Sequence, residues 1–271
     1  MSDDSSPDRR TPGVNTTVAH SARIWNYWLD GKDHYDVDSR VGEVIKRAFP
    51  DIVRMARADR AFLTRAVRYL ADEAGIRQFL DIGTGLPTFD NTHEVAQRVA
   101  PESRIVYVDN DPLVLAHARA LLTSTRRGAT DYIQADAQAP DAILEAAART
   151  LDFTRPVGIV MLGITHFLLD DYEAKRIVDR LLSAVPSGSY LVLSHATAVV
   201  NPKGITESVR HWNRYGRPKM YLRSPSEIGR FFEGLELLEP GVVSFPHWRP
   251  DAHGPNESAE VDGYCGVARK P

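Results

Sequence analysis

An acidic residue and two glycines mark the first candidate binding site. Asp81 lies two positions before Gly83, and Gly85 follows two positions later, at the end of the apolar segment 79–82. Glycine lets a backbone pass close to a ligand, and the turn after the first strand of a parallel sheet faces the ligand crevice. A carboxylate before that turn suits a ligand that carries an ammonium group and no phosphate. We expect Asp81, Gly83 and Gly85 to bind such a ligand.

A second group of polar residues follows the next apolar segment, residues 104–108. Asp109 comes at the tip of this segment, where a carboxylate can accept both hydroxyl hydrogens of a ribose. Asn110 follows directly, and we include it in the predicted cofactor contact. Asp111 precedes Pro112 and is equally suited to capping a helix that has the proline at its first position. Asp109 is therefore the preferred ribose ligand.

A third pair, Asp136 and Ala137, follows the segment 131–135. The carboxylate could accept from an adenine amino group, and the backbone N–H of Ala137 could donate to a ring nitrogen. An acid after three successive strands, together with the glycine turn, predicts a nucleoside site. The dinucleotide fingerprint would need a third glycine where Thr88 stands. A NAD-dependent oxidoreductase is therefore the less favoured alternative.

Two histidines are candidates for acid–base chemistry. His166 follows the fourth apolar segment and His195 ends the fifth, so both could face the crevice at the carboxyl ends of the strands. The alternative for each is a hydrogen-bonded residue in the wall of the fold. No histidine pair has the spacing of helical metal ligands, and Cys265 is the sole cysteine. We therefore expect no metal site and no disulfide.

The elements that must position these residues alternate between short apolar strands and helical patterns, which is typical of a parallel sheet built from βα units. Two helices precede them: a short one that Ser21 caps and that extends to Leu29, and a longer one that runs from after Pro50 to about residue 74. Residues 1–20 are expected to be a disordered tail, and residues 244–261 a long loop. The predicted strands are 78–82, 104–108, 131–135, 157–162, 190–195, 235–243 and 264–269.

At Asp81, Gly83, Gly85, Asp109 and Asp136 the chain resembles the class I S-adenosylmethionine-dependent methyltransferases. More narrowly, it is similar to a bacterial family named S-adenosyl methyltransferases and formerly catalogued as a domain of unknown function. Three stretches carry the narrower resemblance: residues 21–34, 60–70 and 78–88. Pro87 stands where the class usually has a third glycine, although it matches the narrower family. Asp59 stands where that family leads us to expect asparagine, which puts a ligand contact there in doubt.

The resemblance implies an α/β fold with a Rossmann-like, seven-stranded, mostly parallel sheet whose last strand is antiparallel. It implies an N-terminal helical cap over residues 21–73 and a cofactor-binding domain over residues 74–271. The implied cofactor is S-adenosylmethionine. Because the resemblance is tightest near the cap, Tyr27 and Lys32 are expected to fold over this cofactor, with the lysine meeting a carboxylate and the aromatic ring meeting the sulfonium.

Composition limits the partners of the protein. The 271 residues carry a formal net charge of −3, with 43% hydrophobic and 25% charged residues. This balance predicts no attraction to nucleic acid or to membranes. We expect a cytoplasmic methyltransferase that acts on a small-molecule acceptor, with a homodimer possible through cap aromatics. The alternative is a non-catalytic protein that binds S-adenosylmethionine or S-adenosylhomocysteine.

Overall fold

The computed structural model describes residues 15–121, 123–251 and 259–271. Its main sheet follows the order β4-β3-β2-β5-β6-β10-β8, with β9 (Val243–Ser244) pairing beside β10. All pairs from β4 to β6 are parallel, whereas β10 is antiparallel to β6, β8 and β9. The strands are β2 (Gln78–Ile82), β3 (Arg104–Asp109), β4 (Ala129–Gln134), β5 (Gly158–Met161), β6 (Tyr190–Ala196), β8 (Glu236–Leu237) and β10 (Gly263–Arg269). The predicted Rossmann-like α/β fold is confirmed.

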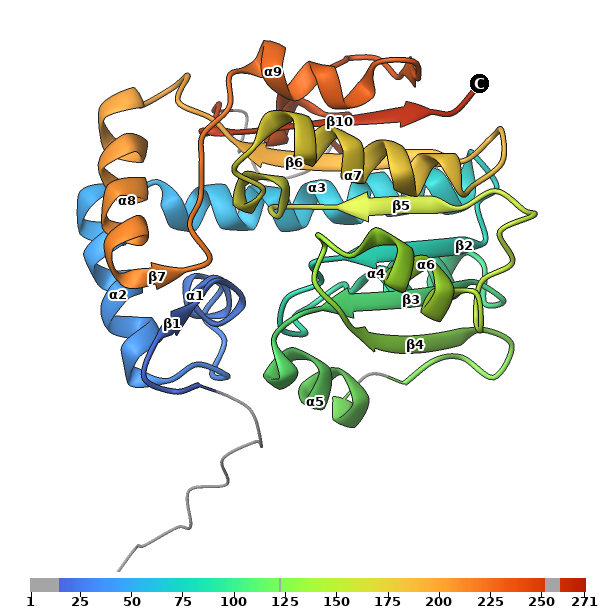
Figure 1. Ribbon diagram of the computed structural model, residues 1–271, viewed down its shortest axis with the longest axis horizontal. Helices are drawn as coiled ribbons and strands as arrows, with labels where there is room; N and C mark the ends of the chain where they lie inside the picture. Colours follow the sequence, from blue (N-terminus) through green and yellow to red (C-terminus); the bar gives the residue numbers. More distant parts are fainter. Residues whose placement is uncertain (1–14, 122, 252–258) are drawn as a thin grey trace, which may run out of the picture.

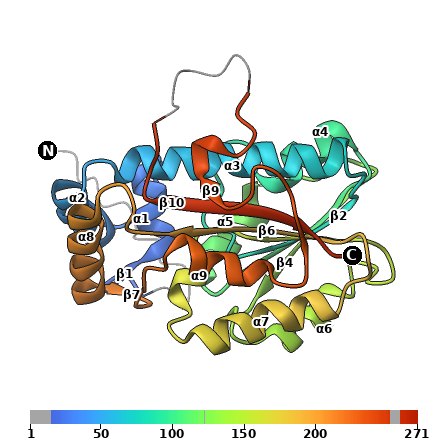
Figure 2. The same ribbon diagram turned by 90° about the horizontal axis from the view of Figure 1, so that it is seen from above.

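Helices cover both faces of the sheet, and Figure 2 shows α3 and α4 on one side and α6 and α7 on the other. Alternate side chains of a strand enter the two cores, as the pleat requires: Phe79 packs with the α3 side and Leu80 with the opposite side. The helices flanking the sheet are α3 (Ile52–Asp72), α4 (Thr92–Val99), α5 (Pro112–Leu121), α6 (Pro140–Ala147), α7 (Asp171–Ser183) and α9 (Pro225–Gly229).

One predicted strand, residues 235–243, is wrong as a continuous element. The segment forms only β8 and β9, two residues each, with a turn between them. Pro240 has no N–H to donate to a ladder, and Gly241 has a φ of +87°, so this stretch cannot continue as a paired strand. The sheet therefore has the expected seven-strand path, but its far edge is short.

A cap lies beyond the carboxyl ends of the parallel strands, at the left of Figure 1. It contains α1 (Ser21–Trp28) and α2 (Asp36–Ala48), and also α8 (Pro202–Tyr215), which packs against α2. Strand β1 (Ala19–His20) pairs in parallel with β7 (Gly216–Arg217) and ties the N-terminal segment to the end of α8. The cap is therefore assembled from two distant parts of the sequence.

The start of the chain differs in detail from the sequence analysis. Residues 1–14 of the predicted tail lie outside the described residues, whereas residues 19 and 20 form β1. Ser21 is the first helical residue of α1, and His20 occupies the N-cap position expected for Ser21. Of the helices in the described part of the chain, none has the length and apolar character needed to cross a membrane.

Candidate active site

A large cavity opens where the sheet order reverses, between the carboxyl ends of β2 and β5 and beneath α1. Crevices at such switch points are where open α/β sheets bind their ligands. Its empty space, counted with the open mouth, is about 1270 Å³.

The glycine turn after β2 forms the floor of this cavity. Gly83 and Gly85 have φ values of +77° and +69°, in the left-handed region that favours glycine. A Cβ on Gly83 would lie 1.9 Å from the Ile164 side chain, whereas a Cβ on Gly85 would meet no atom within 4 Å. Gly83 is thus required by packing, while Gly85 leaves open space beside the backbone for a ligand.

Asp109 lies at the end of β3 and fixes this turn. Its Oδ2 accepts a hydrogen bond of 2.9 Å from the N–H of Gly85, and its Oδ1 accepts one of 2.9 Å from the N–H of Asp111. Burial raises the pKa of Asp109 to about 6, against the opposing effect of these amide donors. Each carboxylate oxygen retains acceptor capacity toward the cavity that Asp109 lines.

Asp81 and Arg60 place opposite charges on one wall of the cavity. The Asp81 carboxylate accepts a 2.5 Å hydrogen bond from the Thr92 hydroxyl, and burial raises its pKa to about 6. The Arg60 guanidinium comes from α3 and donates to the carbonyl oxygens of Phe89 and Asp90 at 2.8 and 3.2 Å. Charge from Arg60 acts on Asp81 and opposes the rise in its pKa. Together they match a ligand that carries both an ammonium and a carboxylate.

Asn110, Asp136 and Ala137 form the outer rim of the cavity. The Asn110 side-chain amide donates to Oδ2 of Asp136 at 3.2 Å, and the Gln138 N–H donates to Oδ1 of the same residue at 2.9 Å. Both Asn110 and Asp136 are exposed to solvent. The structure therefore brings all seven predicted residues of the sheet edge to one cavity: Asp81, Gly83, Gly85, Asp109, Asn110, Asp136 and Ala137.

The two candidate histidines have different environments. His166, in the turn η1 (Thr165–Phe167), lines the cavity, and its Nδ1 is buried with no hydrogen-bond partner in the described structure. Burial, and secondarily the charge of Arg223, lowers the pKa of His166 to about 3, so the ring is neutral at physiological pH.

His195 is fully buried and lies outside the cavity wall. Its Nδ1 lies 2.6 Å from the carbonyl oxygen of Ala196, and its Nε2 lies 2.9 Å from an Arg223 nitrogen. Since a carbonyl only accepts and a guanidinium only donates, Nδ1 carries the proton and Nε2 accepts. Neither nitrogen is available to a substrate. The structure thus does not place His195 as a base, although the sequence made it a candidate.

Arg223 holds the loop that carries His166, and the sequence analysis did not single it out. Its buried guanidinium donates to the carbonyl oxygens of Thr165 and Leu168 at 2.9 and 2.7 Å, and to Asp171 at 2.8 Å. These bonds join the segment before α9 to the end of β5 through a single side chain. No local motif marks a buried arginine, so only the tertiary structure reveals this role.

Asp59 is a site residue that the sequence left in doubt. It lines the cavity from α3, is 5% exposed, and its Oδ1 has no hydrogen-bond partner in the described structure. Burial raises the pKa of Asp59 to about 6, against a hydrogen bond from the Ser194 hydroxyl. A Cβ placed on Gly163 would lie 3.9 Å from Oδ2 of Asp59 and 3.8 Å from Cε1 of His166. Asp59 and His166 therefore flank the same space at the end of β5.

Tyr27 and Lys32, the two predicted contacts from the cap, are outside the wall of the cavity. The Tyr27 hydroxyl donates to Glu43 of α2. Helix α1 presents Trp25 and Leu29 to the cavity instead. Residues four apart share a helix face, whereas Tyr27 is two positions from Trp25, a rotation of about 200° around the helix. The register of α1 thus turns Tyr27 toward α2.

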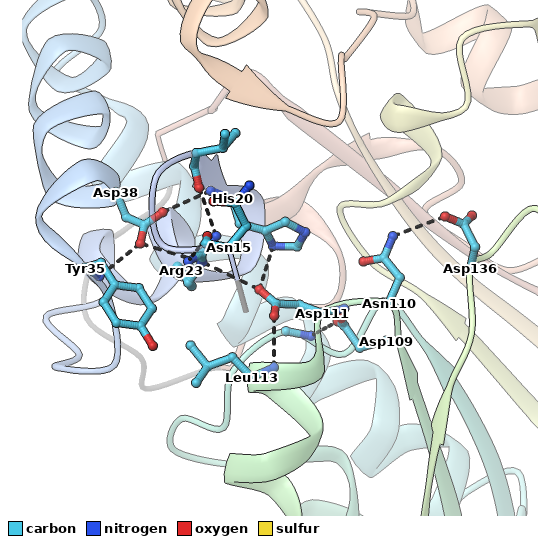
Figure 3. A network of polar contacts seen from close by, with 12 residues as sticks. Asn15, His20, Arg23, Tyr35, Asp38, Asp109, Asn110, Asp111, Leu113 and Asp136 are labelled. Carbon is cyan, nitrogen blue, oxygen red and sulfur yellow. Dashed lines mark hydrogen bonds and ion pairs between the residues drawn. The ribbon is translucent and has the colours of Figure 1, made fainter. Parts of the chain in front are cut away.

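A polar network joins the cap to the loop after β3 (Figure 3). Oδ2 of Asp111 lies 3.1 Å from Nδ1 of His20 and 3.5 Å from Nε of Arg23, which also lies 3.6 Å from Asp38 of α2. Oδ1 of Asp111 accepts from the N–H of Leu113 at 2.9 Å, so the residue also caps α5. Asp111 therefore anchors the cap beside the cavity, while Asp109, two residues before it, faces the ligand space.

The fold and the cavity define a Rossmann-like α/β protein with a nucleoside-type site under a helical cap. The chain belongs to the S-adenosyl methyltransferase family, whose pattern matches residues 7–271. It is therefore an enzyme of the S-adenosylmethionine-dependent methyltransferase class. Among the described residues, no group of three or more His, Cys, Asp or Glu side chains is placed to hold a metal ion.

Two solved structures of relatives share this architecture over nearly the whole of the matched chains. A DUF574 family protein from Streptomyces avermitilis is 49% identical, with a TM-score of 0.90 over 94% of this chain and 99% of that chain. A candidate methyltransferase from Thermobifida fusca is 37% identical, with a TM-score of 0.86 over 96% and 97% of the two chains. A carboxy-S-adenosyl-L-methionine synthase from Chromohalobacter salexigens is 25% identical over 83% of this chain and 78% of its own length.

Proposed function

We propose that the enzyme transfers a methyl group from S-adenosylmethionine to a small-molecule acceptor. The observation that carries this assignment is the order of charges along the cavity. Asp109 at the end of β3 would bind the ribose hydroxyls, and Asp136 with the Ala137 N–H would bind the adenine. Asp81 and Arg60 would bind the ammonium and carboxylate of the methionine part.

The buried acids support a cationic ligand. Burial raises the pKa of both Asp81 and Asp109 to about 6, which shows that their ionised forms lack sufficient compensation within the protein alone. A bound ammonium would stabilise ionised Asp81, and ribose hydroxyls would donate to Asp109. Arg60 lies on the same wall as Asp81 and would neutralise the carboxylate of the ligand. The residues present therefore fit the cofactor.

When bound, the sulfonium supplies an electrophilic methyl group, and the electron pair of the broken carbon–sulfur bond stays on sulfur to give S-adenosylhomocysteine. The protein would contribute by orientation and by excluding water. Trp25 and Leu29 of α1 cover the cavity, and His166 and Asp59 flank the space at the end of β5. For an acceptor that loses a proton, Asp59 would take it, because its free carboxylate oxygen is the stronger base of the two groups.

The shape of the cap favours a small acceptor. Helix α1 lies over the cavity and is held there through Arg23 and Asp111, while β7 joins β1 at its edge. Helix α1 thus covers part of the cavity that Asp59 lines. The net charge of −3 also gives no attraction to nucleic acid.

Calorimetric titration of the purified full chain tests the proposal. S-adenosylmethionine and S-adenosylhomocysteine should bind with micromolar dissociation constants, whereas NAD should show no heat of binding. The protein must first be checked for cofactor retained through purification. Binding of NAD, or no binding of any of the three, would contradict the assignment of Asp81, Asp109 and Asp136.

A further inference from the structure

A second cavity lies inside the cap, next to the one that would hold the cofactor. Its empty space, counted with the open mouth, is about 520 Å³, and it lies between α1, α2, α3 and α8. The two cavities share Ser21, Trp25, His166 and Phe167 as wall residues. The two cavities therefore adjoin at these four residues.

The wall of this second cavity is made mostly of apolar side chains from all four helices, among them Ile24, Trp28, Met55, Ile205 and Trp212. No aspartate, glutamate, lysine or arginine of the described chain lines it. Burying an ion without a partner costs several kcal/mol or more. The cavity is therefore unsuited to a carboxylate, a phosphate or an ammonium.

Three polar groups on the helix walls have hydrogen-bond partners within the protein. The indole N–H of Trp28 donates to the carbonyl oxygen of Gly42 at 3.2 Å, and that of Trp212 donates to the carbonyl oxygen of Pro218 at 2.7 Å. The Ser208 hydroxyl donates to the carbonyl oxygen of Ile205 at 2.7 Å. A ligand here meets apolar surface and aromatic rings, which favour flat ring systems.

His166 stands at the junction of the two cavities. Its Nδ1 is buried without a partner in the described structure, although buried polar atoms nearly always have one. The neutral ring can use this nitrogen to accept from a hydroxyl or, in its other tautomer, to donate to one. A ligand that fills the apolar cavity and ends in a hydroxyl group would satisfy it.

We propose that this cavity is the acceptor site and that the acceptor is an uncharged ring compound whose hydroxyl group meets His166. This inference rests on the proposed methyltransferase function, whose cofactor occupies the neighbouring cavity. The ring system would lie between Trp28 and Trp212, and the hydroxyl would point toward the space that Asp59 and His166 flank. Selection would come from the absence of charge in the wall, because an ionised analogue would leave its charge unpaired.

The test compares two probes of the same shape on the full chain saturated with S-adenosylhomocysteine. 4-Phenylphenol is neutral and carries one hydroxyl, whereas biphenyl-4-carboxylate carries a charge. Calorimetry should show at least about tenfold tighter binding of the phenol, since burying an unpaired charge is costly. Three of the four tryptophans line the cavity, so the phenol should also change tryptophan emission. Equal affinities, or no binding of the phenol, would overturn the proposal.

A pair of substitutions on α8 locates the binding site. Val209 lines the cavity and is half-buried, so Val209→Trp should fill the space and weaken 4-phenylphenol binding at least about tenfold. Thr206→Trp, at an exposed position of the same helix, should leave it unchanged. Both variants should bind S-adenosylhomocysteine as the wild type does. Equal phenol binding by Val209→Trp and the wild type would overturn the proposed location.

Failure of this inference is distinguishable from failure of the proposed function. If S-adenosylhomocysteine binds but the phenol does not, the acceptor site is wrong and the methyltransferase assignment stands. If S-adenosylhomocysteine does not bind the wild-type protein, the proposed use of the first cavity is wrong, and the acceptor site falls with it.

Discussion

The two cavities under the cap differ in how the chain builds them. The first lies at the ends of β2, β3 and β4 and contains buried carboxylates whose ionisation the protein alone supports poorly. The second lies among helices, and its wall in the described chain carries no charged side chain. A charged cofactor and an uncharged acceptor would thus be separated by chemistry, with His166 and Phe167 at the shared wall.

The largest effect should come from replacing Arg223, whose guanidinium donates to backbone carbonyl oxygens on both sides of His166 and Phe167. Arg223→Met leaves the carbonyl oxygen of Leu168 and the Nε2 of His195 without this donor, and the carbonyl oxygen of Thr165 keeps only the backbone N–H of Leu168. Urea unfolding should show a loss of about 3–5 kcal/mol in unfolding free energy.

The exposed Arg230 provides the control for that experiment. Arg230→Met should change the free energy of unfolding by less than about 0.5 kcal/mol. If the two variants were equally stable, the contacts of Arg223 would not be what holds the His166 loop in place.

The next effect concerns Asp59, a carboxylate in the wall of the first cavity. Its pKa is raised from 3.8 to about 6, so the stability present below pH 4 is lost as the pH rises through 6. A pKa difference of this size corresponds to about 3 kcal/mol of unfolding free energy. Asp59→Asn does not titrate, so at pH 8 and without ligand it should be more stable than the wild type by up to that amount.

Asp152→Asn is the matched control for the pH experiment. Asp152 is exposed, and hydrogen bonds from Thr154 lower its pKa, so its ionisation has the opposite sign of effect. Its substitution should therefore not stabilise the protein at pH 8. Thermal unfolding between pH 4 and 8 measures both variants, and an Asp59→Asn protein that is less stable than the wild type at pH 8 would contradict the burial of an uncompensated carboxylate.

On the cofactor side, Asp109→Ala should weaken binding of S-adenosylhomocysteine by more than about tenfold without unfolding the domain. The substitution removes the acceptor for ribose and also releases the N–H of Gly85. Calorimetry measures the change, and Val209→Trp on the apolar side should stay within about twofold of the wild type. Unchanged affinity in Asp109→Ala would contradict the ribose contact of Asp109 and would indicate Asn110 or Asp111 instead.

The smallest effect is expected in the cap residues that the structure turns away from both cavities. Lys32→Ala and Tyr27→Phe should each change the affinity for S-adenosylhomocysteine by less than about twofold, because neither side chain lines a cavity wall. Calorimetric titration with S-adenosylhomocysteine measures the affinity of both variants. A tenfold loss in either variant would show that the cap closes differently around the bound cofactor, as the sequence resemblance implied.

The contrast between the cavities also explains what could be predicted from the sequence. Asp81, Asp109 and Asp136 each follow a strand directly, so a local pattern locates them, and the parallel sheet brings the strand ends together. The apolar cavity is made by residues as distant as Ile24 and Trp212, and no local pattern records their contact.

Other differences have similar causes. Helix α2 was not predicted, although Val37, Val41 and Ile45 recur every four residues within it and were an available signal. The interpretation of Tyr27 failed to consider the register of α1. The predicted strand 235–243 ignored the missing N–H of Pro240.

A crystal structure of the full chain with S-adenosylhomocysteine tests the central claim most directly. We predict the ribose hydroxyls on Asp109, the ammonium beside Asp81, the carboxylate on Arg60, and the apolar cavity free of the cofactor. An adenosine ring bound between Trp28 and Trp212 would contradict this account, because it would reverse the roles of the two cavities.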